Sequence, residues 1–72
     1  MNGWELVYSD GFAPAVELRR VVLENYDIPS IILNKKDSSY HFGMVELHVP
    51  SESAIHARLI LDEQYGFNFR LN

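Results

Sequence analysis

Hydrophobic residues recur at every second position in residues 4–9 and 44–49, and this period predicts two β-strands. A short β-branched run at residues 30–34 predicts a third strand. The alternating apolar residues are Trp4, Leu6 and Tyr8 in the first segment and Val45, Leu47 and Val49 in the second. Since Trp4, Leu6 and Tyr8 are the larger apolar set of the first strand, we expect that side to pack on the core.

A spacing of three or four residues between apolar positions predicts two helices. The first spans residues 14–26, with Pro14 in its first turn, where a missing N–H costs nothing. The second begins near Ser51 or Ser53, either of which can cap it, and ends at Gly66. The expected buried stripes are Ala15, Leu18, Val22 and Tyr26, widened by Val21 and Leu23, in the first helix, and Ala54, Ala57, Ile60 and Leu61 in the second.

After Gly66, the residues Phe67, Phe69 and Leu71 alternate with polar ones, which predicts a last short strand, with a frayed tail as the alternative. The element order is then β-α-β-β-α-β. Right-handed crossovers turn this order into a ferredoxin-like, two-layer α+β sandwich with an antiparallel sheet. We expect one domain over residues 1–72, with sheet order 4-1-3-2 and both helices on one face.

Charge and composition exclude several classes of protein. Ten acidic against six basic residues give a net charge of −4, which opposes binding to nucleic-acid phosphates or to an anionic membrane. The absence of cysteine excludes disulfides, thiolate metal sites and a cysteine nucleophile. Neither a secretory signal nor a long apolar run is recognisable, so we expect a cytoplasmic protein.

Polar residues of catalytic type do not form a recognisable motif. The histidines at positions 41, 48 and 56 make no HxH or HxxxH pair, and Glu46 with His48 on one strand face offers too few ligands for zinc. The Ser, His and Asp residues at 37–41 lack a Gly-x-Ser-x-Gly elbow. We therefore expect no enzyme, no bound metal and no cofactor, and solvated histidines.

The two lysines of the chain, Lys35 and Lys36, form with Tyr40 and His41 a local basic and aromatic cluster in the loop between the second and third strands. A nucleotide phosphate or another anion could bind there. No glycine-rich phosphate loop accompanies the cluster. The simpler interpretation is that the lysines keep the loop soluble or protect an edge strand.

Apolar residues on both faces of the strands suggest a surface for association. Aromatic residues make up 12% of the chain, and helices cover only one sheet face in the expected fold. The remaining face predicts binding to a protein partner or to a second copy, as a homodimer with twofold symmetry. The alternative is a set of aromatic residues scattered singly over a twisted sheet. The candidate interface residues are Ile32, Met44, Glu46, His48, Phe67 and Phe69.

Several of these patterns together resemble a family of short bacterial domains of unknown function, described as prokaryotic signal-transducing proteins. The resemblance covers residues 4–61 and rests on apolar positions and one Ile-Pro pair. It implies a ferredoxin-like fold related in shape to the nitrogen-regulatory PII proteins, and it brings no catalytic motif. The matching segments are Leu6-Val7-Tyr8-Ser9, Ala15-x-x-Leu18, Leu23-Glu24-x-x-x-Ile28-Pro29, Val45-x-Leu47-x-Val49-Pro50 and Ala54-x-x-Ala57.

Two departures from the family matter. Asp27 stands where the family commonly has a glycine before its Ile-Pro pair, which implies a helix C-cap with positive φ at this position. The loop from Asn34 to Gly43 is much shorter than the regulatory loop of PII proteins, so their effector mechanism is not carried over. The sequence therefore predicts a non-catalytic regulatory or protein-interaction module, with a PII-like sensor of small anions as the alternative.

Overall fold

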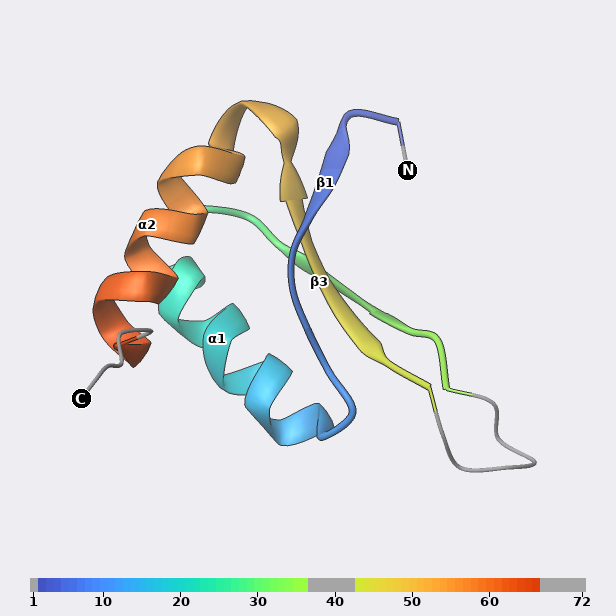
Figure 1. The fold of residues 1–72 in the computed structure, drawn as a ribbon. Coiled ribbons are helices and arrows are strands. Elements are labelled where there is room, and N and C mark those ends of the chain that lie inside the picture. The colour runs from blue at the N-terminus through green and yellow to red at the C-terminus, as the bar shows by residue number, and fades with distance from the viewer. Residues whose placement is uncertain (1, 37–42, 67–72) are drawn as a thin grey trace.

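Two helices lie against one side of a three-stranded antiparallel sheet in the computed structural model, which describes residues 2–36 and 43–66 (Figure 1). The expected order β-α-β-β-α is confirmed, and the expected strand at residues 67–71 lies outside the described residues. The elements are β1 (Trp4–Asp10), α1 (Ala13–Asn25), β2 (Ile31–Asn34), β3 (Val45–Pro50), a 3-10 turn (Ser51–Ser53) and α2 (Ala54–Tyr65).

The sheet has the strand order β1-β3-β2, with both pairings antiparallel. Strand β3 therefore lies in the centre, between two strands that come from distant parts of the sequence. Leu47 of β3 pairs with Tyr8 of β1 on one side and with Ile32 of β2 on the other. The protein is thus a small α+β domain, and its order 1-3-2 agrees with three of the four strands expected.

The hydrophobic core lies between β3 and the helices, as the alternation in β3 predicted. Leu47 and Val49 are fully buried, because α1 and α2 both cover this face. The predicted stripe of α2 is confirmed, since all four of its residues belong to the core. Ser53, one of the two predicted caps, stands at the N-cap of α2, but its side chain makes no capping hydrogen bond. Neither described helix is long and apolar enough to cross a membrane.

Helix α1 packs through a stripe that only partly matches the predicted one, since Leu23 belongs to the core and Val22 packs against it, as predicted. Val16 and Leu23, two turns apart, are fully buried, whereas Leu18, Val21 and Tyr26 are 56%, 41% and 45% exposed. The helix carries apolar residues on opposite sides, so the spacing alone could not select the buried side. Contact with the sheet makes that selection, and it leaves Leu18 and Val21 pointing away from the core.

A β-bulge in β1 changes which side chains face the helices. Leu6 pairs with His48 and Tyr8 pairs with Leu47, so Val7 is the extra residue. Tyr8 and Val7 pack against the core, while Leu6 shares the face of His48 that no described helix covers. The expectation that Trp4, Leu6 and Tyr8 all face the core is therefore wrong, because the bulge breaks the strict alternation after Leu6.

Helix α1 ends in a Schellman motif at Asp27, the position where the family resemblance implies a helix C-cap with positive φ. Asp27 has φ = 61°, and its N–H donates to the carbonyl of Glu24 at 2.9 Å. The N–H of Ile28 donates to the carbonyl of Leu23 at 3.0 Å, and both side chains belong to the core. The predicted C-cap with positive φ is confirmed.

Candidate functional site

The face of the sheet opposite the helices, called here the helix-free face, carries a row of apolar side chains. The strand register places Leu6, His48 and Ile31 side by side across the three strands, with Trp4 and Leu33 in the neighbouring rows. Leu6 is 40% exposed, and Met44, just before β3, is 43% exposed. This face therefore carries apolar side chains from β1 and β2, and the exposed Met44 directly precedes β3.

A histidine and a glutamate occupy the centre of the helix-free face. His48 is only 8% exposed although no described helix covers it, so it is the cross-strand neighbours that exclude water. Its Nε2 lies 2.9 Å from Oε1 of Glu46, and its buried Nδ1 has no hydrogen-bond partner among the described residues. Leaving a buried polar atom unpaired costs about 1–3 kcal/mol. The expectation of a solvated histidine is wrong at this position.

The predicted interface residues fall into three groups. Glu46 and His48 lie on the helix-free face, as predicted, and Met44 lies just before β3 and is 43% exposed. Ile32 does not, because it pairs with Leu47 and packs against the core on the helix side. Its placement on the open face is therefore wrong. Residues Phe67 and Phe69 lie outside the described residues.

The basic cluster of the β2–β3 connection is only partly described. The backbone N–H of Lys35 donates to the carbonyl of Met44 at 2.8 Å, and that of Lys36 donates to Oδ1 of Asn34 at 2.9 Å. These bonds fix the two lysines where β2 leaves the sheet. Tyr40 and His41 lie outside the described residues, so the described residues bring together only two of the four predicted ligand-binding residues.

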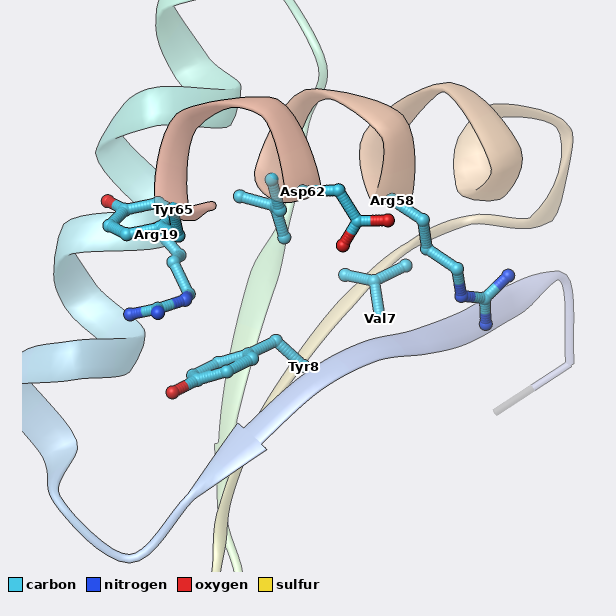
Figure 2. Close-up of a pocket in the computed structure, with 7 residues that line it drawn as sticks. Val7, Tyr8, Arg19, Arg58, Asp62 and Tyr65 are labelled. Carbon is cyan, nitrogen blue, oxygen red and sulfur yellow. The ribbon is translucent and has the colours of Figure 1, made fainter. Parts of the chain in front are cut away.

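A cavity that the sequence did not reveal lies between β1 and the two helices (Figure 2). Its volume is about 300 Å³, and its floor and roof are the strand and α2. The residues that line it are Val7, Tyr8, Arg19, Arg58, Leu61, Asp62 and Tyr65. Because these come from three elements, no local sequence motif could have identified the cavity.

Arg19 closes one end of the cavity between two aromatic rings. Its guanidinium carbon lies 4.0 Å from the ring centre of Tyr8 and 3.8 Å from that of Tyr65, and Figure 2 shows it between the two rings. Its Nη1 also donates to the carbonyl of Ala15 at 3.0 Å. Each such cation–π contact contributes about 0.5–2 kcal/mol. The stack joins β1, α1 and α2 through a single side chain.

Arg58 lies at the other end of the cavity and is also engaged by the protein (Figure 2). Its Nη1 donates to Oε2 of Glu5 at 2.9 Å, and its Nη2 donates to the carbonyl of Leu6 at 2.7 Å. The carboxylate of Asp62 lies on the same cavity wall. Since both arginines already have partners and a carboxylate stands beside them, the cavity is poorly suited to a free anion.

A charge-assisted hydrogen bond anchors Tyr8 beyond the cavity. The Tyr8 hydroxyl donates to Oδ2 of Asp10 at 2.5 Å, and the N–H of Phe12 donates to Oδ1 at 2.8 Å. Burial and the bond to Asp10 raise the pKa of Tyr8 above 10.0. The same bond, with that from Phe12, lowers the pKa of Asp10 below 3.8. At neutral pH the pair therefore consists of a phenol and a carboxylate.

Metal ligation finds no support in the described part of the chain, where no three His, Asp or Glu residues lie close enough to share an ion. No protein-family model, curated protein or solved structure matches this chain. The resemblance to the signal-transducing family therefore stays a prediction. The two features that the geometry offers for function are the helix-free face and the cavity beside β1.

Proposed function

We propose that this chain is a small non-catalytic regulatory module with a ferredoxin-like fold, which binds a second copy of itself or a protein partner through the helix-free face. The observation that carries the proposal is the register of the sheet. It places Trp4, Leu6, Ile31 and Leu33 on one face, around a histidine that is 8% exposed.

Covering the helix-free face with a partner is favourable because it buries apolar surface. Burial of apolar surface is favourable by about 25 cal/mol per Å², and soluble monomers rarely leave a large contiguous apolar patch in water. The polar pair at the centre, Glu46 and His48, already bonds internally and is partly desolvated. A docking partner would therefore remove mainly apolar atoms from water. A twofold contact with an identical face would do this for both copies.

The ferredoxin-like part of the proposal is supported by the element order and by the strand order β1-β3-β2. The placement of both helices on one side of the sheet supports it as well (Figure 1). A complete fold of this type has a fourth strand beside β1, which is where the described sheet ends.

A pair of leucine substitutions tests the helix-free face. Leu6→Glu puts a charge on this face, whereas Leu59→Glu puts the same charge on α2 at a leucine that is 62% exposed. We expect the unmodified chain to form dimers in sedimentation velocity at rising concentration. Leu6→Glu should shift it to monomer, and Leu59→Glu should leave it dimeric.

Two results would contradict this proposal. One is an unmodified chain that stays strictly monomeric at millimolar concentration and also recovers no protein partner in a pull-down. The other is dimerisation that Leu59→Glu abolishes and Leu6→Glu does not, since this result would move the contact to the helical side. Circular dichroism of both variants checks that each still folds.

A further inference from the structure

The centre of the helix-free face holds one acid and one base with apolar residues around them. Nε2 of His48 lies 2.9 Å from Oε1 of Glu46, and the side chains of the two residues are only 10% and 25% exposed. The neighbours of His48 across the sheet are Leu6 on β1 and Ile31 on β2. Whatever covers this face therefore covers a titratable pair that is already shielded from much of the surrounding water.

The charged residues of the flanking strands do not compensate this pair. Glu5 and Asp10 of β1 pair with core residues of β3, so their side chains point to the helix side. Lys35 directly follows β2 and is exposed, and among the described residues no ion pair joins it to Glu46. Both described helices lie on the other side of the sheet (Figure 1). The charge at the centre of this face is therefore set by Glu46 and His48 themselves.

The total charge of the pair changes by one unit when His48 gains a proton. Histidine side chains ordinarily change charge between about pH 5 and pH 8. With a neutral imidazole the pair carries the single negative charge of an ionised Glu46, whereas with an imidazolium it is an ion pair without net charge. Burying an isolated charge costs far more than burying a hydrogen-bonded ion pair. The protonated pair is therefore the form that a docking partner covers more easily.

The unpaired Nδ1 of His48 does not alter this difference. This atom is already buried in the single chain, where it has no hydrogen-bond partner among the described residues. Any cost of its missing partner is therefore the same before and after docking. What docking adds is the loss of the water that still reaches the carboxylate of Glu46.

We propose that protons regulate association through the helix-free face: two copies of the chain dock when His48 is protonated and separate when it loses that proton. This inference rests on the proposed function and names a second copy as the partner. In a twofold contact each copy presents the same acid and base pair. Two faces without net charge then meet at acidic pH, whereas two uncompensated carboxylates are buried at alkaline pH.

Sedimentation velocity of the full chain at about pH 5.5 and about pH 8 tests this regulation. Both buffers contain high salt, which screens the general repulsion between chains of net charge −4. We expect the dissociation constant of the dimer to be roughly tenfold or more lower at the acidic pH, because docking and proton uptake are linked.

Three variants assign the effect to the pair. His48→Gln can still bond to Glu46 but carries no charge, so its dissociation constant should be the same at both pH values. Glu46→Gln leaves the protonated histidine as the only charge of the pair, so the pH dependence should reverse. His56→Gln, at an exposed histidine of α2, is the matched control and should behave like the unmodified chain. Circular dichroism checks that each variant folds, and either of the first two variants decides without the other.

Three outcomes would overturn the proposal. Equal dimerisation of the unmodified chain at both pH values would do so while leaving the helix-free face as the contact. A pH dependence that persists in His48→Gln, or that keeps its sign in Glu46→Gln, would assign the effect to other groups. A chain that is monomeric at both pH values would end the regulated dimer, and the proposed function would then depend on a different protein as partner.

Discussion

The two faces of the sheet reach burial by different means. On the helix side, Leu47 and Val49 of β3 are fully buried under α1 and α2. On the opposite side, His48 of the same strand is 8% exposed although no helix among the described residues covers it, and its neighbour Leu6 is 40% exposed. A central strand can therefore be buried on both faces while its flanking strands are covered on only one.

This difference separates the packed core from the face that we propose for binding. The helix side carries the buried apolar core, so we expect it to contribute most of the free energy of folding. The helix-free face tolerates the pair Glu46 and His48 because the pair lies next to solvent and bonds internally at 2.9 Å. Four measurements, ordered from the largest expected effect to the smallest, test this comparison.

Leu47→Ala and Leu33→Ala compare the two faces with the same substitution. Leu47 is fully buried in the core, and its loss should lower the free energy of unfolding by about 2–5 kcal/mol. Leu33, on the helix-free face and partly exposed, should lower it by less than half as much. Urea denaturation of both variants measures this, and equal losses would show that the two faces contribute alike.

Arg19→Ala and Arg20→Ala test the stacking of the Arg19 guanidinium between the rings of Tyr8 and Tyr65. Arg19 contacts two rings, so its loss should cost about 1–3 kcal/mol. Arg20 makes exposed ion pairs with Glu17 and Glu24, which contribute about 0–1 kcal/mol. Equilibrium unfolding separates the two, and an Arg19 effect as small as that of Arg20 would refute a structural role for the stack.

Asp27→Gly tests the turn that connects α1 to β2. A glycine at φ = 61° avoids the strain of a left-handed residue, which outweighs its greater freedom in the unfolded chain. The melting temperature should rise by about 2–6 °C. Asn25→Gly, inside α1, is the matched control and should lower it. A melting temperature that falls or stays constant in Asp27→Gly would contradict the cap.

The hydrogen-bonded pair of Tyr8 and Asp10 predicts that the free energy of unfolding falls at both acidic and alkaline pH and is highest between the two. The pKa of Asp10 is lowered in the folded state, so its contribution is present above pH 3.8 and is lost as the pH falls below that value. The pKa of Tyr8 is raised, so its contribution is present below pH 10.0 and is lost as the pH rises further.

Melting curves of the wild type and of Tyr8→Phe measure this pH dependence. Tyr8→Phe keeps the ring over Arg19 and removes the hydroxyl, so it should abolish the alkaline loss and weaken the acid loss. Unchanged losses at both ends would assign them to other groups.

Regular local patterns predicted part of this structure well. The alternation in β3 identified Val45, Leu47 and Val49 as core, and the spacing in α2 identified its four buried residues. These predictions succeeded because each segment has a single apolar side. The helix cap at Asp27 was implied by the family resemblance, in which a glycine commonly precedes the Ile-Pro pair.

Where a segment has two apolar sides, the pattern was not sufficient. Helix α1 buries Val16, which was not predicted, and leaves Leu18 and Val21 exposed, and the bulge at Val7 turns Leu6 to the helix-free face. The cavity of the candidate site escaped prediction altogether, because Arg19, Tyr8 and Tyr65 meet only after three elements have packed.

The sequence by itself determined the order of strands and helices, the core face of the central strand and the ends of both helices, because these depend on residues a few positions apart. Only the tertiary structure decided which side of α1 is buried, how β1 shifts its register and where the cavity and the shielded histidine lie. These features depend on contacts between segments far apart in the chain, and no local periodicity records such contacts.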